Sequence, residues 1–339
     1  MRCRYKLLLV SIVVLVIAAL AGPRVQPHAL HWPSSQPALP QSPLALQAWL
    51  DAQERSVAGL RTDNQARIVW ADPAHPARTA CAIVYLHGFG ASQGEGAPTH
   101  QRLAQVFGCN LYLARLPGHG LLAADAMRGL DAQQLLDAAA QALAIGHALG
   151  DKVIVIGTSM GGALALDLAA QRPQAIDALV LWSPLVREHD DVLTPMTWPW
   201  GATWLRYTRN HGSEIVHGKS DSLYWAADNH LDGYRSLTEL TRGELLPATF
   251  ARITAPVFLG YYYRDEQHQD PTVSVAAMLD MYNQLGTPAA LKRKQDFPDA
   301  GAHVIASPLR SKSVDQVFAA TRDFLQQVIG LRPLAGLPP

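Results

Sequence analysis

The stretch KVIVIGTSMGGALAL, residues 152–166, decides the fold, because it predicts a buried strand that turns into a helix within about four residues. Residues 153–156 are apolar, continuous and β-branched, which is typical of a strand buried on both faces of a parallel sheet. After the turn, strong helix formers continue from Ala163 until Pro173 ends the helix. One hydroxyl residue, Ser159, stands in the turn itself.

Glycines on both sides make room for Ser159. In so short a turn the serine has to adopt a strained backbone conformation, which requires neighbours without bulk, and Gly157 and Gly161 meet that need. The pattern is G-x-S-x-G, the nucleophile elbow, which holds the hydroxyl clear of the sheet. The next backbone N–H, that of Met160, points at the same space from a helix N-terminus. The simpler alternative is a tight turn in which the serine only caps the helix.

Strands and helices alternate along the chain from residue 80 onward. The expected strands and helices are strands 81–86, 110–114, 152–157, 177–183 and 256–262 and helices 98–107, 131–149 and 160–171. Continuous apolar strands separated by helices indicate a parallel sheet covered on both faces. The expected fold class is therefore α/β, with a mostly parallel sheet and helices on both of its faces.

A long gap between the last two of these strands breaks the alternation. Residues of about 184–255 hold a helical segment, SLTELTRGELL, and many aromatic residues: Trp198, Trp200, Trp204, Tyr207, Tyr224, Trp225 and Tyr234. This composition indicates a lid over the carboxyl ends of the strands, where ligands bind in such sheets. The alternative is a structural excursion whose tryptophans belong to the core.

The bulk composition bounds the number of domains and the classes of partner. With 339 residues, 49% of them apolar, the chain can form one large or two modest domains with a real core. A formal net charge of zero gives no reason to expect nucleic acid as a partner. The folded domain is expected over residues 44–330, followed by a short tail at 331–339.

The N-terminus predicts export. Basic residues precede an apolar run over residues 7–21, interrupted only by Ser11. Residues 1–21 are therefore expected to be either a signal peptide or a transmembrane helix. Cleavage of a signal peptide would leave a periplasmic or secreted protein. In the second case the domain would be membrane-anchored and face the outer side of the inner membrane. Residues 22–43 are rich in proline and predict an extended linker with little to pack.

Two cysteines stand at matching places in two expected strands. Cys81 and Cys109 each lie five positions before the end of their strand, so their sulfurs fall side by side if the strands are parallel neighbours. Export would allow them to form a disulfide. The alternative is two separate buried thiols.

A serine nucleophile needs a base, an acid that orients the base, and donors for the oxyanion, in the chain order serine, acid, histidine. His303, in FPDAGAHVIASP, fits the base, because a loop before the final helix can reach over the strand ends. The acid is expected in RDEQHQDPTVS, where Asp270 is favoured over Asp265 because it lies just before a helix. A metal site built from this loop matches no known ligand spacing.

The loop LHGFGAS ends the first expected sheet strand at the level of Ser159. Its glycines, Gly88 and Gly90, let the backbone turn toward the serine, so that the N–H of Phe89 can form an oxyanion hole with that of Met160. A phosphate-binding loop is the weaker reading, since neither G-K-[ST] nor G-x-G-x-x-G opening a helix is present.

Five motifs, LHGFG, ARLPGHG, VIGTSMGG, QDPTVS and GAHVIAS, stand in the order seen in α/β-hydrolase fold proteins. Over residues 83–329 the chain resembles monoacylglycerol-lipase-like and serine-aminopeptidase-like hydrolases. The resemblance implies a nucleophile, an acid, a base and two oxyanion donors: Ser159, Asp270, His303, Phe89 and Met160. Two departures are a longer acid loop and few strands before the first glycine loop.

These residues predict a serine hydrolase that cleaves a carboxylic ester, lipid-like or with a small apolar acyl group, through an acyl-enzyme. An apolar, aromatic lid suits such a small-molecule ester, and no cofactor or metal is expected. A peptidase acting on short peptides is the nearest rival and would need a charged anchor, for which Glu214 and residues 188–191 are candidates. The third reading is a non-catalytic binding module that keeps the fold.

Overall fold

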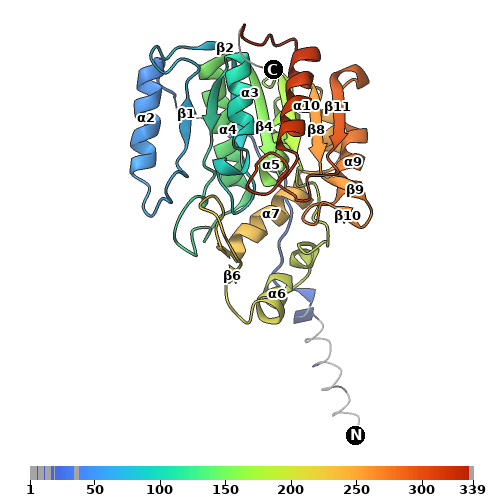
Figure 1. The fold of residues 1–339 in the computed structure, drawn as a ribbon. Coiled ribbons are helices and arrows are strands. Elements are labelled where there is room, and N and C mark those ends of the chain that lie inside the picture. The colour runs from blue at the N-terminus through green and yellow to red at the C-terminus, as the bar shows by residue number, and fades with distance from the viewer. Residues whose placement is uncertain (1–5, 7–10, 12–16, 19, 34–37, 336–339) are drawn as a thin grey trace.

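A seven-stranded sheet forms the centre of the computed structural model, which describes residues 6, 11, 17, 18, 20–33 and 38–335 (Figure 1). The strands in spatial order are β1 (Arg67–Val69), β3 (Asn110–Leu113), β2 (Thr79–Leu86), β4 (Gly150–Thr158), β5 (Ala178–Trp182), β8 (Val257–Tyr261) and β11 (Lys292–Asp296). β1 pairs antiparallel with β3, and the other neighbours in this sheet are parallel. The predicted mostly parallel α/β sheet is confirmed.

Helices cover both faces of this sheet (Figure 1). One face carries α4 (Ala132–Leu149), α5 (Met160–Gln171), α8 (Pro247–Arg252) and α9 (Val275–Gln284). The other face carries α3 (Thr99–Phe107) and α10 (Val314–Gln327), which contact each other. α2 (Pro43–Arg55) flanks β1 at the edge of the sheet. Each face of the sheet therefore has its own apolar core.

The two cores follow from the alternation of side chains along each strand. In β2, Val84 and Leu86 belong to the core under α4 and α5, whereas Ile83 and Tyr85 belong to the core under α3 and α10. Both sets are at most 1% exposed. This explains why the strand has a continuous apolar run and no polar face.

A disulfide joins Cys81 of β2 to Cys109, the residue before β3, with their Cα atoms 4.8 Å apart. β2 and β3 are parallel neighbours, so the predicted adjacency is confirmed, and of the two alternatives for the sulfurs the structure has the disulfide. The bridge spans 28 residues, for which the chain-entropy model gives a stabilisation of about 3.5 kcal/mol. It ties the strand that leads into the glycine loop to its neighbour.

The insertion between β5 and β8 consists of η2 (Thr194–Thr197), α6 (Gly201–Arg209), β6 (Ile215–His217), β7 (Asp228–His230) and α7 (Leu231–Gly243). In Figure 1 it lies beyond the ends of the sheet to which the strand arrows point. Three of its tryptophans, Trp198, Trp200 and Trp204, are 54%, 46% and 49% exposed and so do not belong to the core. Tyr234 of α7 instead reaches inward, with its ring centroid 4.9 Å from that of Phe89.

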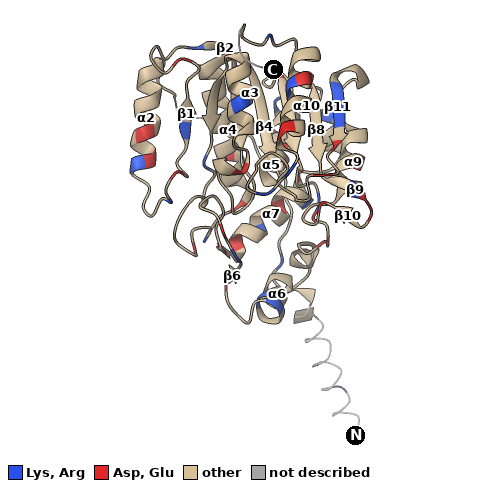
Figure 2. Cartoon of the chain, in the orientation of Figure 1, with Lys and Arg blue, Asp and Glu red and all other residues tan. Residues whose placement is uncertain are grey.

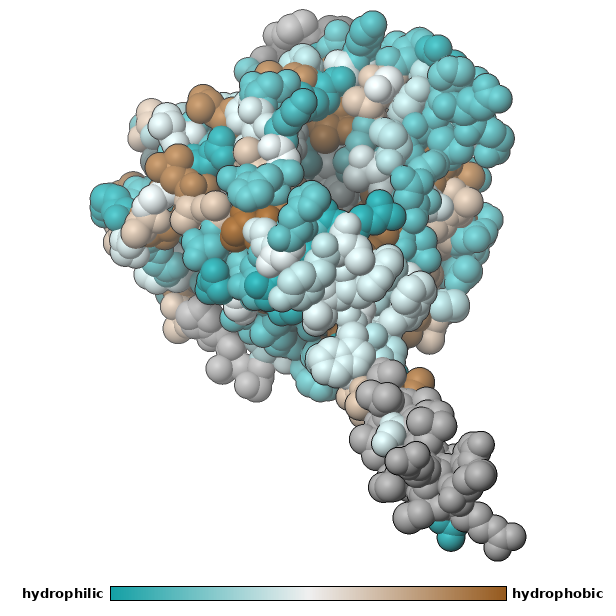
Figure 3. Space-filling model, turned by 90° about the horizontal axis from the view of Figure 1, so that it is seen from below, coloured by the Kyte–Doolittle hydropathy of each residue, from teal (hydrophilic) through white to brown (hydrophobic). Residues whose placement is uncertain are grey.

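Charged residues of both signs are interspersed over the ribbon in Figure 2. The face over the insertion, seen in Figure 3, mixes hydrophilic residues with pale, intermediate ones, and hydrophobic residues are scattered singly. Single exposed apolar side chains of this kind are normal for a folded protein.

Residues 22–33 have no regular secondary structure, as the proline-rich sequence suggests, but they pack against the domain more closely than a linker would. Val25 and Leu30 are buried, and the Val25 N–H donates a hydrogen bond to the carbonyl of Met196 in η2. The Leu30 N–H donates to the Glu244 carboxylate beyond α7. The N-terminal segment therefore braces the insertion.

The predicted transmembrane helix, and with it the membrane attachment, has to be corrected. Across the residues that the structure describes, no helix is long and apolar enough to span a bilayer. The apolar run itself covers only residues 7–21, whereas a spanning helix needs about 20 apolar residues. Most of the predicted leader, including residues 1–5, 7–10, 12–16 and 19, lies outside the described residues.

Candidate active site

Ser159 lies in the predicted turn, between the end of β4 and the first residue of α5. Its φ of 52° and ψ of −118° are a strained conformation for a residue with a side chain. A Cβ atom on Gly161 would lie 2.0 Å from the carbonyl oxygen of Leu86, and one on Gly157 would lie 2.5 Å from that of Gly161. The glycines are therefore required by close backbone contacts, as the sequence predicts.

An imidazole and a carboxylate meet in the same region. His303 Nδ1 lies 2.8 Å from Asp270 Oδ2. The other oxygen of Asp270 accepts hydrogen bonds from the N–H groups of Thr272 and Val273, at 2.9 and 3.0 Å. These bonds fix the carboxylate, which in turn fixes the imidazole ring. His303 Nε2 is buried and has no hydrogen-bond partner among the described residues, so it is available to a reacting group.

Asp265 is engaged elsewhere. The longer acid loop forms a small hairpin, β9 (Tyr263–Asp265) and β10 (His268–Gln269). Within it Asp265 Oδ1 accepts from the N–H groups of Gln267 and His268 and lies 2.8 Å from His268 Nδ1. The extra residues thus satisfy Asp265 locally, while Asp270, after the hairpin, faces His303. No group of three or more metal-ligating side chains occurs within the described part of the chain.

The electrostatics of the pair favour the charged forms. Burial alone would raise the pKa of Asp270, but the charge and hydrogen bond of His303 and the two backbone N–H groups outweigh it and lower the pKa. Burial alone would lower the pKa of His303, but the charge and hydrogen bond of Asp270, with a further charge from Glu95, raise it. An imidazolium at this position is therefore stabilised, which general base catalysis requires.

The glycine loop passes close to Ser159. A Cβ atom on Gly88 would lie 3.1 Å from Ser159 Cβ, so only glycine allows this approach. Met160 is the first residue of α5, so no carbonyl of a preceding helical turn can accept a hydrogen bond from its N–H. His87 ties the loop down, because its Nε2 accepts from the Leu116 N–H at 3.1 Å and burial lowers its pKa to about 3. Its role is structural.

Ser159 and His303 line one cavity of about 320 Å³, a volume in the range of small-molecule sites. The residues around it come from the sheet ends and the insertion: Phe89, Glu95, Ser159, Leu185, Glu188, Val192, Leu193, Trp225, Tyr234, Leu237, Thr272, His303 and Val304. The structure thus brings the predicted nucleophile, base and loop residue together at one opening.

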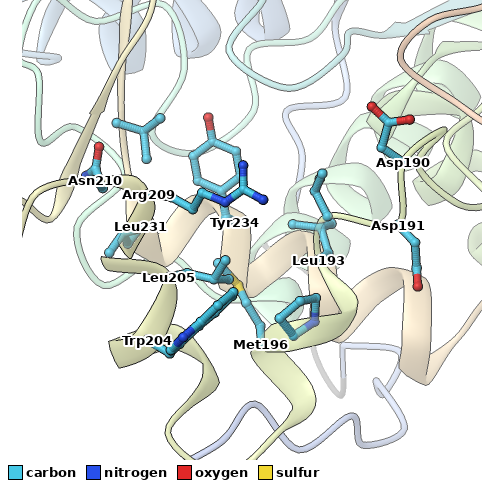
Figure 4. Close-up of a pocket in the computed structure, with 13 residues that line it drawn as sticks. Asp190, Asp191, Leu193, Met196, Trp204, Leu205, Arg209, Asn210, Leu231 and Tyr234 are labelled. Carbon is cyan, nitrogen blue, oxygen red and sulfur yellow. The ribbon is translucent and has the colours of Figure 1, made fainter. Parts of the chain in front are cut away.

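A second cavity, of about 390 Å³, adjoins the first inside the insertion. Val192, Leu193 and Tyr234 line both cavities. Figure 4 shows Leu193, Leu205 and Tyr234, from three segments of the insertion, around the common space, with Trp204 and Met196 on one side. The lining is mainly apolar, but it includes the Arg209 guanidinium beside Tyr234, Asn210 at one side, and Asp190 and Asp191 at the opposite side.

Of two acidic residues that line the first cavity, Glu95 has no counterpart in the sequence predictions, whereas Glu188 belongs to the predicted peptide-anchor segment 188–191. Glu95 is buried beside the glycine loop and lines the first cavity. Glu188 lines the same cavity, but Arg242 binds both of its oxygens, at 2.8 and 2.9 Å. The only feature of the sequence that could point to a role for Glu95 is its position soon after the loop GFGAS. The burial of its carboxyl group cannot be predicted from the sequence.

Comparison with known proteins finds similarity to hydrolases over part of the chain. Residues 77–230 match the family model described as "Serine aminopeptidase, S33". The chain is 31% identical over 123 residues to a pimeloyl-[acyl-carrier protein] methyl ester esterase of Nitrosospira multiformis, and 33% identical over 122 residues to that of Nitrosomonas europaea. The matched region is 35% of this chain in both cases and 43% and 42% of the relatives, so the chain spans less than half the length of the curated relatives it matches.

Solved structures extend the likeness to most of the chain. One describes LipS and LipT, two metagenome-derived lipolytic enzymes, with a TM-score of 0.61, 16% identity and coverage of 79% of this chain and 99% of the other. Another is a monoglyceride lipase of Saccharomyces cerevisiae, with a TM-score of 0.57, 15% identity and coverage of 78% and 91%. The protein therefore has the α/β-hydrolase fold, and the predicted resemblance to hydrolases of that fold is confirmed.

Proposed function

We propose that the protein is a serine hydrolase that cleaves a carboxylic ester with an apolar acyl group through an acyl-enzyme on Ser159. One observation carries the proposal: His303, hydrogen-bonded to Asp270, opens onto the same cavity as a serine held in a strained strand-to-helix turn. This is the arrangement of nucleophile, base and orienting acid that acyl transfer needs. The similarity to esterases and lipolytic enzymes supports it.

The reaction then proceeds in two halves. His303 Nε2 takes the proton of Ser159 while the serine oxygen attacks the ester carbonyl, and the N–H groups of Phe89 and Met160 donate to the oxyanion. The tetrahedral intermediate collapses, the C–O bond breaks, and the alcohol leaves with the proton from His303. Water repeats the sequence on the acyl-enzyme, with His303 again as base, and releases the carboxylic acid. Asp270 stays ionised and balances the imidazolium charge throughout.

The acyl chain is proposed to occupy the two adjoining cavities. The carbonyl would sit at Ser159, and the chain would pass Leu193 and Tyr234 into the apolar cavity between α6 and α7. Each buried CH₂ contributes about 0.8 kcal/mol, which is roughly a fourfold gain in kcat/KM if it is realised in the transition state. In this proposal the insertion acts as the predicted lid.

Narrowing the second cavity tests this placement. We expect kcat/KM of the wild-type protein to rise along a series of p-nitrophenyl esters from acetate to decanoate, and Leu205→Trp to lower it at least tenfold for decanoate and far less for acetate. The matched control is Leu122→Trp, because Leu122 is 72% exposed and does not line either cavity. A flat series, or an equal loss for all esters, would contradict the placement of the chain.

A peptidase of the same fold is the second candidate, and the family description favours it. Three of the four acids predicted as peptide anchors are, however, already paired with arginine, and the fourth, Asp190, is 77% exposed and lies 3.8 Å from His189. Arg242 binds Glu188 and also Asp191, and Glu214 pairs with Arg128 and Arg206. A carboxylate held by arginine has little charge left for a substrate ammonium group, so we favour ester hydrolysis. Hydrolysis of an alanine anilide faster than of the acetate ester would reverse this choice.

We also infer that the domain functions after export, in a periplasmic or extracellular setting. The Cys81–Cys109 disulfide supports this inference, because such bonds persist in oxidising compartments.

A further inference from the structure

Glu95 is a buried carboxyl group in the active-site cavity that the reaction described above does not use. It ends η1 (Gln93–Glu95), the short helical turn after the glycine loop, and is 2% exposed. Carboxyl groups are rarely buried without a partner, because desolvation is costly. Its contacts therefore show what holds it there.

Those contacts lie on the glycine loop and the sheet. Glu95 Oε2 accepts a hydrogen bond from the Gly88 N–H at 2.6 Å and another from the Tyr85 hydroxyl at 3.3 Å. Glu95 Oε1 lies 2.7 Å from the point where a Cβ atom on Gly88 would be, and Ser159 Cβ lies 3.1 Å from that point. The carboxyl group and the nucleophile thus flank the same peptide unit.

We propose that Glu95 is a positioning residue of this site: it fixes the Gly88 peptide beside Ser159 and gives His303 a second carboxylate besides Asp270. The proposal rests on the proposed function, since the positioned groups are those of ester hydrolysis. Because the Gly88 N–H is committed to Glu95, the following N–H, that of Phe89, is left to face the oxyanion. Loss of this anchor would let the loop rotate away from its donor geometry.

The charges around Glu95 define its second role. Burial raises the pKa of Glu95 to about 7, although the Gly88 N–H, the charge of His303 and the Tyr85 hydroxyl lower it. His100 of α3 packs on Tyr85, and burial lowers its pKa to about 4, so it is neutral near pH 7. His303 lines the same cavity as Glu95 and is the cation whose charge lowers the pKa of Glu95, while the Asp270 carboxylate binds His303 at Nδ1.

The sign of the effect follows from these charges. An ionised Glu95 stabilises the imidazolium form of His303, so it raises the pKa of the base. The acid limb of kcat/KM reports the pKa of the base in the free enzyme, because only neutral imidazole can accept the serine proton. Because Glu95, with a pKa of about 7, is only partly ionised across that limb, removing its charge should move the limb to lower pH by less than a full charge interaction would.

Glu95→Gln separates charge from hydrogen bonding, because the amide oxygen can still accept from the Gly88 N–H. We expect the acid limb for p-nitrophenyl butyrate to shift down by roughly half to one pH unit, with KM nearly unchanged. NMR titration of the His303 ring should show the same downward shift without any turnover. Glu95→Ala also removes the anchor and should lower kcat about tenfold further, a fraction of the loss of a whole oxyanion donor.

Glu188→Gln is the matched control, because Glu188 lines the same cavity and Arg242 keeps Asp191 as a partner. It should leave the acid limb where it is. An unshifted limb and an unshifted His303 titration in Glu95→Gln would overturn the proposal, as would an equal shift in Glu188→Gln. A loss of activity in Glu95→Gln that is confined to alanine p-nitrophenyl ester would also overturn the proposal, because it would indicate that Glu95 binds the ammonium group of a substrate. A wild-type protein without esterase activity refutes the proposed function instead, and the NMR titration still tests Glu95.

Discussion

Ser159→Ala is expected to lower kcat for p-nitrophenyl butyrate by several powers of ten while the protein remains folded. Without the hydroxyl no acyl-enzyme can form, and the oxyanion donors alone retain only a small part of the rate enhancement. The smaller side chain fits the strained turn at least as well, since φ at residue 159 is 52° and the neighbouring glycines already leave room. Initial rates and a thermal melt measure the two effects.

Ser56→Ala serves as the control, because Ser56 is exposed at the end of α2, away from the cavity. It should match the wild-type protein in rate and in Tm. A Ser159→Ala variant that keeps most of its activity would show that the ester is cleaved elsewhere.

Asp270→Asn should reduce kcat by about four powers of ten, and Asp265→Asn by less than a factor of three. The carboxylate of Asp270 holds His303 at Nδ1 and balances its positive charge, whereas an amide can hold the ring in the wrong tautomer. Asp265 serves its own hairpin, where its partners are backbone N–H groups and His268. Parallel kinetics of the two variants measure the difference.

The two substitutions are chemically identical and lie in one loop, so each controls for the other. Equal losses would indicate damage to the loop as a whole. A larger loss for Asp265→Asn would move the orienting acid to that residue and contradict the hydrogen bond seen at His303.

The site could be predicted wherever local sequence constrains the backbone. The turn at Ser159 needs small neighbours, so the glycine spacing alone predicts its conformation. The continuous apolar runs of β2, β4 and β5 likewise predict a sheet buried on both faces. Matched positions in two strands predict that Cys81 and Cys109 lie side by side, but they do not decide whether the two sulfurs are bonded.

Other parts depend on contacts that no local pattern carries. β11 has the sequence KRKQD, and its residues are mostly exposed at the edge of the sheet. Its sequence therefore has no alternation of apolar and polar residues from which a strand could be predicted. The segment 22–33 has a linker composition, yet Val25 and Leu30 find apolar partners on the insertion. The sequence favours Asp270 over Asp265 only by position in the loop. The structural reason is the hairpin, whose backbone N–H groups and His268 bind Asp265 and leave Asp270 to bind His303.

Labelling with a fluorophosphonate is the most direct measurement of the central claim that Ser159 is an activated nucleophile. An activated serine oxygen attacks phosphorus and expels fluoride, which leaves a stable covalent adduct that peptide mass spectrometry can locate. We expect one adduct, on the peptide that contains residue 159, absent from Ser159→Ala and formed much more slowly by His303→Ala. A folded wild-type protein that takes up no probe, or an adduct on another residue that persists in Ser159→Ala, would contradict the claim.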